Sequence, residues 1–331
     1  MRYKTFDNTI GQQIPVARLS ESIMSGERDK EMLSPLLIGE AGKGKTRLMQ
    51  DYLSGMKDIG CDVLEFSSPA ELRSKGGAFS SFMELIMHSP KYAIGFDEAH
   101  EINGSAGQGA TVQLAKIRSF LMKALDKTNN GRAIRMDDET VVDFNRKRGS
   151  IVLATNFPHL LDKSGAFQSR CDTIILDDYS DQELIEILQL MLSKVDFKPA
   201  CDKTLEMIAK CGRGTARPLE KLVDQLKITS NAGAGKKTIN RDDVKAALKM
   251  TKMYPLGLQA WEINILTRTQ LAVRDNVLRA IMPNIEKATY DKSKGYLLGK
   301  GLAAQTTQGL QRTDKGERYL KTIAQDGFVV A

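Results

Sequence analysis

The chain has 331 residues, 41% of them hydrophobic and 27% charged, so we expect a sizeable apolar core in two or three domains rather than a disordered chain. No apolar run approaches the roughly 20 residues that a membrane span needs, and the first residues lack the apolar core of a signal peptide. The net charge of +7 favours a polyanionic partner.

The first predicted strand leads into the most informative stretch of the chain. Residues 33–38 are a short apolar run, which is typical of a buried parallel strand, and a helix is expected over 46–57. Between them lies Gly-Glu-Ala-Gly-Lys-Gly-Lys-Thr, a complete G-x-x-x-x-G-K-[ST] phosphate loop. The glycines let backbone N–H groups point at phosphate oxygens, Lys45 reaches the β- and γ-phosphates, and Thr46 binds Mg²⁺. The predicted nucleotide-binding residues of this stretch are Gly39, Glu40, Ala41, Gly42, Lys43, Gly44, Lys45, Thr46 and Arg47.

A second apolar strand, over residues 92–97, ends in an acidic pair. Asp97 lies where a strand tip offers a carboxylate to Mg²⁺, and Glu98 is placed to polarise the attacking water as a general base. His100 follows this pair and is expected to be an exposed motif residue rather than a ligand.

A third apolar strand, over residues 151–155, is followed by Asn156, which is a candidate to orient the lytic water. We expect these three strands to be neighbours in one parallel sheet, because ligand groups then gather at its carboxyl edge.

With these motifs in this order, the chain resembles an AAA+ ATPase. The resemblance implies ATP and Mg²⁺ as ligands and adds two catalytic arginines. Arg170, within Phe167-Gln-Ser-Arg-Cys-Asp, matches the arginine finger that reaches the nucleotide of a neighbouring subunit. Arg217, within Gly212-Arg-Gly-Thr-Ala-Arg, matches the second sensor arginine, which contacts the phosphates in cis.

The resemblance narrows to the bacterial RuvB family of branch-migration motors, from residue 6 to about 320. Phe6-Asp-Asn-Thr-Ile-Gly-Gln is similar to the opening segment of that family, in which Ile10 and Gly11 line the adenine pocket. Gly309-Leu-Gln-Arg-Thr-Asp-Lys-Gly-Glu-Arg is similar to its terminal motif. Two departures stand out: Glu40-Ala41 replaces two prolines, and the finger segment Ser169-Arg-Cys looks more like a clamp-loader subunit.

The predicted fold is a P-loop α/β core with a parallel sheet over 1–178, a small helical lid over 179–253 and a C-terminal winged helix over 254–331. In the core, helices are expected at 14–26, 46–57 and 108–126, and strands at 33–38, 61–66, 92–97, 151–155 and 173–176. In the lid, helices are expected at 181–194, 203–211, 216–230 and 241–252, the first opened by a capping box at Ser180.

Residues 127–149 form a polar insert that predicts a β-hairpin ahead of the third strand. Such hairpins face a partner protein or the channel of a ring. The candidate contacts on it are Arg132, Arg135, Arg146, Lys147 and Arg148.

The last quarter of the chain predicts helices over 258–282 and 285–302, then a strand, a turn and a closing strand or helix near 310–320. That order is typical of a winged helix. From 255 onward there are eleven Lys and Arg against seven Asp and Glu, so 11 − 7 = 4 of the seven excess positive charges lie here. The predicted DNA contacts are Lys292, Lys294, Arg312, Lys315 and Arg318.

The sequence therefore predicts an ATP-driven motor on double-stranded or branched DNA, assembled as a homo-oligomeric ring, with a hexamer preferred. One alternative is a clamp- or helicase-loader-like switch that remodels a replication protein. Another is an ATP-gated DNA-binding regulator without catalysis. Four cysteines without metal-ligand spacing fit a reducing cytoplasm, that of a bacterial cell or of a host cell for a viral protein.

Overall fold

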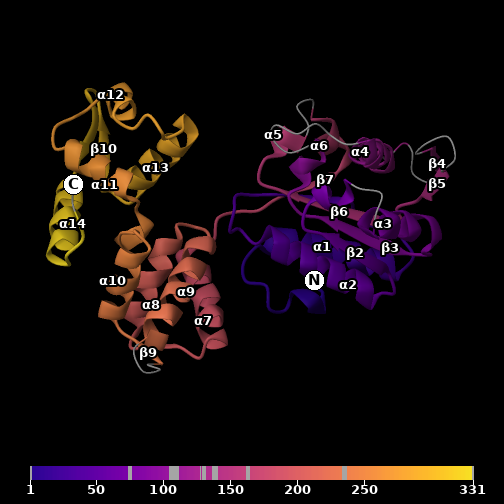
Figure 1. The fold of residues 1–331 in the computed structure, drawn as a ribbon, viewed down its shortest axis with the longest axis horizontal. Coiled ribbons are helices and arrows are strands. Elements are labelled where there is room, and N and C mark those ends of the chain that lie inside the picture. The colour runs from indigo at the N-terminus through magenta and orange to yellow at the C-terminus, as the bar shows by residue number, and fades with distance from the viewer. Residues whose placement is uncertain are drawn as a thin grey trace. The chain divides into compact units, whose positions relative to one another are not determined.

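The chain divides into two compact units, Met1–Tyr179 and Ser180–Ala331, in the computed structural model (Figure 1). The structure describes residues 2–73, 77–103, 112–126, 128, 132–135, 141–161, 165–232 and 237–329. The division falls within one residue of the first predicted boundary. The second predicted boundary, near residue 253, stays a prediction.

A five-stranded parallel sheet forms the middle of the first unit. Its order is β2-β3-β6-β1-β7, so the three predicted motif strands are adjacent, as expected. The phosphate-loop strand β1 lies between β6 and β7, with Leu36 opposite Leu153 and Thr173. The strands are β1 (Pro35–Ile38), β2 (Asp62–Phe66), β3 (Tyr92–Phe96), β6 (Gly149–Thr155) and β7 (Asp172–Ile175).

Apolar side chains that alternate along the strands build one core on each face of this sheet. Leu37, Ala93 and Val152 face a core with the first two helices, whereas Leu36, Ile94 and Leu153 face a core with the next two. The result is a three-layer α/β unit. Its helices are α1 (Gln13–Glu27), α2 (Lys45–Asp58), α3 (Gly77–His88), α4 (Val112–Ala124), α5 (Pro158–Leu161) and α6 (Ala166–Arg170), with 3-10 turns η1 (Lys4–Phe6), η2 (Pro69–Leu72) and η3 (Ala99–Asn103).

The predicted hairpin is present as strands β4 (Arg132–Arg135) and β5 (Val141–Phe144), which pair antiparallel. Ile134, Val142 and Phe144 point into the core, so the hairpin is packed onto the unit. Its tip and much of the 127–149 insert lie outside the described residues.

Two of the predicted partner contacts of this insert are structural arginines instead. Arg146 is buried, and its Nη1 pairs with Asp172 at 3.1 Å. Arg148 donates from Nε to the carbonyl oxygen of Ser89 at 2.7 Å and lies over the Tyr92 ring. A charged insert suggested surface contacts, but both guanidinium groups are used within the unit.

The second unit begins with four helices. Helix α7 starts at the predicted capping box, in which Ser180 and Glu183 satisfy each other's backbone N–H groups. Arg217 is the first residue of α9, in the first turn as expected. The elements are α7 (Asp181–Lys194), β8 (Lys198–Pro199), α8 (Asp202–Ala209), η5 (Lys210–Gly212), α9 (Arg217–Ala232), β9 (Thr238–Ile239) and α10 (Arg241–Met250).

The rest of the second unit is three short helices, a two-stranded hairpin and a closing helix (Figure 1). Strands β10 and β11 pair antiparallel from Ala303–Arg312 to Thr306–Gly309. The sequence predicted β11 and left open whether the chain closes with a strand or a helix; it closes with a helix. The elements are η6 (Pro255–Gly257), α11 (Ala260–Arg268), α12 (Asp275–Ala280), α13 (Lys287–Gly299), β10 (Ala303–Thr306), β11 (Gly309–Arg312) and α14 (Asp314–Gln325). No helix among the described residues is both long and apolar enough to cross a membrane.

Candidate nucleotide site

The phosphate loop connects β1 to α2 at the carboxyl edge of the sheet. Gly42 and Gly44 have φ angles of 85° and 88°, a left-handed conformation that side chains with a Cβ adopt only at a cost. These turns place the loop over the N-terminal end of α2, where unpaired N–H groups and the helix dipole favour an anion.

The loop holds its own lysine. Lys45 is buried, and its Nζ donates to the carbonyl oxygens of Gly39 at 2.8 Å and Glu40 at 3.0 Å. Phosphate oxygens are stronger acceptors than these carbonyls because they are charged. The Lys45 ammonium group therefore lies beside the position where the loop would bind a phosphate.

The two predicted Mg²⁺ ligands, Thr46 and Asp97, are in direct contact. The Thr46 hydroxyl donates to Oδ2 of Asp97 at 2.5 Å, although 51 residues separate them. A hydroxyl and a carboxylate are the hard oxygen donors that Mg²⁺ uses with substrate phosphates. Among the described residues, no group of three or more His, Cys, Asp or Glu is placed to hold a metal ion by itself, and the donors here fit a metal that keeps phosphate and water ligands.

Glu98 has a left-handed backbone, with a φ of 43°, in the turn that follows β3. Its N–H donates to Oδ1 of Asp97 at 2.9 Å, which ties the two acidic residues to each other. Strained conformations of this kind concentrate at functional sites. The Asp97 carboxylate contacts Thr46, whereas the Glu98 carboxylate lies near His100, so the two acidic groups can take different roles.

His100 and Asn156 complete this edge of the sheet. The Nδ1 of His100 lies 3.2 Å from the Thr155 hydroxyl and 3.5 Å from Oε2 of Glu98, and its ring packs edge-on against Phe157. The prediction of an exposed His100 is therefore wrong, since its side chain is only 16% exposed.

The Oδ1 of Asn156 is buried and has no hydrogen-bond partner among the described residues. A buried, unpaired amide oxygen is costly, so the position fits a group that a ligand or water would satisfy.

Two segments far apart in the sequence border the loop. The family resemblance pointed to the first, around Gln12, whereas no sequence pattern pointed to the second, over residues 177–179. Gln12 exchanges two hydrogen bonds with the backbone of Asp177, at 2.8 and 3.2 Å. The Tyr179 hydroxyl donates to the carbonyl oxygen of Lys43 at 3.1 Å, and the Lys43 ammonium pairs with Asp178 at 2.8 Å. The loop is thus tied to the end of the unit by contacts that no local pattern reveals.

The remaining nucleotide-binding predictions lie around this border. Ile10 and Gly11 are half-buried, and Gly11 has a φ of 65° just before α1. Glu40 is exposed at the start of the loop, and Ala41 is half-buried. Arg47 is exposed on the first turn of α2 and pairs with Asp51 at 3.0 Å.

Arg170 ends α6 and is partly exposed. Its Nε lies 3.3 Å from Oδ2 of Asp126, and its Nη1 donates to the carbonyl oxygen of Ala166 at 3.0 Å. Beneath it, Arg146 donates to the backbone oxygens of Leu125 and Arg170 at 3.3 Å each. The buried Arg146 therefore supports both ends of the Asp126–Arg170 pair.

Arg217 is exposed at the start of α9 in the second unit. The loop before it is tightly turned, with φ angles of 51° at Arg213 and 82° at Gly214.

The predicted DNA contacts fall into two groups. Lys292, Lys315 and Arg318 are exposed, with the Lys315 ammonium resting on the carbonyl oxygen of Lys300. Lys294 pairs with Asp275 at 2.5 Å, and its side chain is only 18% exposed. The Arg312 guanidinium is bound by the Leu266 carbonyl oxygen and by Glu317, with 10% of its side chain exposed. From residue 255 onward, the exposed cations that the sequence patterns did not select are Arg268, Arg274, Arg279, Lys287 and Lys321.

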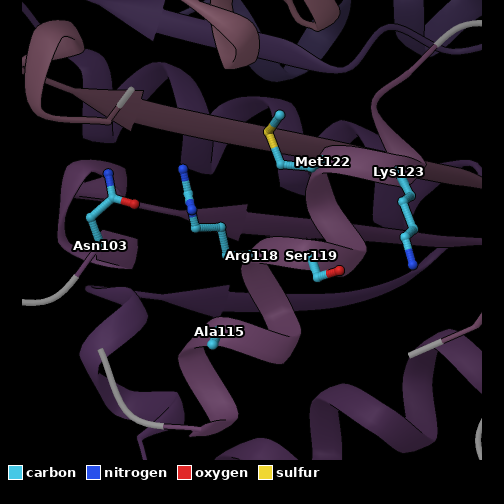
Figure 2. A pocket seen from close by; sticks show the side chains of 6 residues that line it. All are labelled: Asn103, Ala115, Arg118, Ser119, Met122 and Lys123. Carbon is cyan, nitrogen blue, oxygen red and sulfur yellow. The ribbon is translucent and has the colours of Figure 1, made fainter. Parts of the chain in front are cut away.

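A shallow hollow of about 440 Å³ lies on the first unit between η3 and α4. Figure 2 shows Asn103, Arg118, Ser119 and Lys123 around it. None of its lining residues belongs to the phosphate loop or the acidic pair. The nucleotide site is therefore defined by the loop and strand tips and not by this hollow.

Comparisons with known proteins agree with this geometry. Residues 35–179 match the model of the "ATPase family associated with various cellular activities (AAA)". A curated relative, the chaperone protein ClpB of Mycoplasmoides gallisepticum, is 24% identical in an alignment of 197 residues, and the match covers 55% of this chain and 24% of that protein. The chain thus spans about a quarter of that relative's length.

Solved structures match almost the whole chain. A point variant of Thermotoga maritima RuvB is 24% identical, with 97% of this chain and 99% of that chain covered and a TM-score of 0.65. The Thermotoga maritima RuvB Holliday junction branch migration motor is 23% identical, with 97% of this chain and 98% of that chain covered and a TM-score of 0.62. The FIGL-1 AAA domain in complex with ADP is 16% identical, with coverages of 88% and 91% and a TM-score of 0.55. At these identities the structures show a shared fold.

Proposed function

We propose that residues 35–179, which match the AAA family model, act as an ATPase domain, and that the chain is an ATP-driven motor acting on duplex or branched DNA. The first unit would bind and hydrolyse ATP, and the second unit would respond to the nucleotide and hold DNA. Each part of this proposal has its own support among the described residues.

In the first unit, Lys45 would leave the two loop carbonyls for the β- and γ-phosphates. Mg²⁺, when bound, would supply positive charge against the negative charge that develops during phosphoryl transfer. Thr46 and Asp97 would hold it, since their oxygens already meet. Glu98 would accept a proton from the attacking water, and Asn156 would orient that water with its unpaired Oδ1.

The two arginines would sense the γ-phosphate from different chains. We propose that Arg170 acts in trans, because a partly exposed guanidinium at the end of α6 is free to exchange Asp126 for a neighbour's phosphate. Arg217 would act in cis from the first turn of α9, in a helical lid formed by α7–α10. A trans contact requires a heterologous interface, which closes into a ring, and we propose a hexamer. The β4–β5 hairpin remains a proposed site for a protein partner.

The observation that carries the DNA part is the C-terminal arrangement of three helices and a hairpin with exposed cations. Helices α12 and α13 followed by the β10–β11 hairpin have the order of a winged helix. Lys287 and Lys292 are exposed on α13, and Arg318 is exposed on α14. We propose these three, with Lys315, as phosphate contacts, and we leave out Lys294 and Arg312 because both are bound within the unit.

Steady-state ATP hydrolysis would test the proposal. Rates would be measured without DNA, with linear duplex and with a four-way junction, and Glu98→Gln would serve as the blank. Stimulation by duplex or junction supports the DNA motor. Equal rates under all three conditions would reject it. Replacing Lys287, Lys292 and Arg318 by Gln should then make the negative slope of log affinity against log salt shallower by about 0.9 for each phosphate that the protein no longer neutralises.

A second candidate is a switch that remodels a protein on DNA. The Ser169-Arg170-Cys171 segment resembles the finger of clamp-loader subunits, and one curated relative is a chaperone. In that case a protein partner, and not DNA alone, would stimulate hydrolysis. The same assay separates the two candidates once a replication protein is added.

A further inference from the structure

Arg213, four residues before Arg217, belongs to a buried cluster of charged and aromatic groups. Its Nη1 donates to both carboxylate oxygens of Glu262, at 2.9 and 2.8 Å. Glu262 is completely buried. The guanidinium lies over the ring of Tyr296, with 4.0 Å between Cζ and the ring centroid. Arginine forms such paired and stacked contacts in a fixed direction, which lysine does not reproduce.

The backbone around Arg213 is pressed against the segment that enters the C-terminal helices. Arg213 itself is left-handed, with a φ of 51°. Gly257 has a φ of 71°, and a Cβ added there would lie 2.4 Å from the carbonyl oxygen of Cys211. The turns η5 and η6 are therefore in backbone contact, with no room for a side chain between them.

Each C-terminal helix that packs here is bonded to the same junction. From α13, the Tyr296 hydroxyl donates to the carbonyl oxygen of Leu256 at 2.9 Å. From α14, the Tyr319 hydroxyl donates to that of Pro255 at 2.7 Å. At the start of α11, Glu262 also accepts from the backbone N–H of Gln259 at 2.8 Å. Helices α13 and α14, which carry the exposed cations, are thus hydrogen-bonded to the turn that packs against the Arg217 loop.

We propose that Arg213 is the positioning residue that couples Arg217 to the C-terminal helices, through Glu262 and Tyr296. When Arg217 moves in response to the nucleotide, the contacts of Arg213 with Glu262 and Tyr296 move α11, α13 and α14 with it. This inference rests on the proposed function for the role of Arg217. It adds that helices α7–α10 and the C-terminal elements after residue 255 respond to the nucleotide together.

The test compares two variants in the full chain. Arg213→Met with Glu262→Leu replaces the buried ion pair by apolar groups of similar size, a change that folded proteins often tolerate. Lys245→Met is the matched control: the Lys245–Asp326 pair, at 2.7 Å, also joins α10 to the chain just after α14, but it does not touch the Arg217 loop. Arg213→Lys keeps the charge without the paired, stacked geometry, so it serves if the double variant does not fold.

Hydrogen exchange would be followed by mass spectrometry for peptides 212–218, 255–262 and 294–302. Each variant would be measured with Mg²⁺ and a non-hydrolysable ATP analogue, and without them. In the unchanged chain and in Lys245→Met, all three peptides should change their exchange. In the Arg213 variants, only peptide 212–218 should change its hydrogen exchange when the nucleotide is added. Any stimulation of ATP hydrolysis by DNA should disappear in these variants.

Three results are informative. The inference is overturned if 255–262 and 294–302 ignore the nucleotide in the unchanged chain. It is also overturned if they still respond in a folded Arg213 variant. If they respond in the unchanged chain and lose the response in the Arg213 variants, the coupling stands even where no DNA stimulates hydrolysis, and only the proposed DNA function fails.

Discussion

Arg170 is held by a carboxylate of its own chain, with 3.3 Å between its Nε and Oδ2 of Asp126. Asp126 has a lowered pKa, chiefly because the hydroxyl and N–H of Thr128 donate to it and also because Arg170 is close. An Arg170 that reaches a neighbouring subunit must first give up this contact. The Asp126–Arg170 pair therefore opposes the trans contact.

We expect Asp126→Asn to favour the assembled, active state. The amide keeps an oxygen for Thr128 but removes the charge that holds Arg170. Because partly exposed ion pairs are weak, the protein concentration at half-maximal ATPase activity should fall only modestly, by roughly 1.5- to 5-fold. Glu206→Gln, which breaks an exposed pair with Lys210, is the control. An unchanged concentration dependence in Asp126→Asn would count against a trans role for Arg170.

Gly44→Ala should weaken nucleotide binding. The φ of 88° costs a non-glycine residue about 1–2 kcal/mol, which corresponds to roughly 5- to 30-fold in affinity. The new Cβ would also lie 2.5 Å from the Tyr179 hydroxyl. Adding Tyr179→Phe should recover only the steric part of the loss. Titration with a fluorescent ATP analogue measures both effects, and Gly77→Ala, where a Cβ meets nothing within 4 Å, should bind normally.

The phosphate loop and strand tips could be predicted because each is a local pattern. A run of apolar residues followed by glycines or acids determines both the element and its end. Helix α3 was not predicted, although residues 77–88 follow a helical pattern. Phe82, Leu85 and Ile86 are buried in the core, whereas Ser81, Glu84 and His88 are exposed on the other side of the helix.

Contacts between distant segments could not be predicted. Gln12 and Asp177 are 165 residues apart, and neither belongs to a motif that would pair them. The arginines show the same limit. Arg146, Arg148 and Arg312 look like surface charges in sequence, and only the folded chain supplies the partners that bind them.

Arg146→Met should destabilise the first unit strongly. The change removes the guanidinium group that pairs with Asp172, whose side chain is 11% exposed. Losing one member of a buried pair costs about 3–5 kcal/mol. Urea unfolding should show this loss, and Lys147→Met, at the exposed neighbouring position, should stay within about 0.5 kcal/mol of the unchanged chain. If Arg146→Met changed the free energy of unfolding only slightly, the structural role of Arg146 would be wrong, and its predicted role as a partner contact would stand again.

The four thiols should react in a defined order. Hydrogen bonds from Thr204 lower the pKa of exposed Cys201, whereas burial raises the pKa of both Cys61 and Cys211 to about 11. Because the thiolate is the nucleophile, only about 0.1% of a thiol with a pKa of 11 is reactive at pH 8. Iodoacetamide should therefore modify Cys201 first, as mass spectrometry can show. Early modification of Cys211 would instead reveal opening of the junction between η5 and η6.

Mixing two inactive variants tests the trans arrangement directly. Arg170→Ala lacks the finger, and Glu98→Gln lacks the general base, so each alone should hydrolyse little ATP. If Arg170 acts on a neighbour, an interface between Glu98 of one chain and Arg170 of the other is complete. Random equimolar mixing makes about a quarter of the interfaces complete, and activity should return in proportion. Premixed Lys45→Ala and Glu98→Gln chains are the control, since Lys45 and Glu98 would serve the same site and cannot complement. If the first mixture stays as inactive as this control, Arg170 acts within its own chain or not at all.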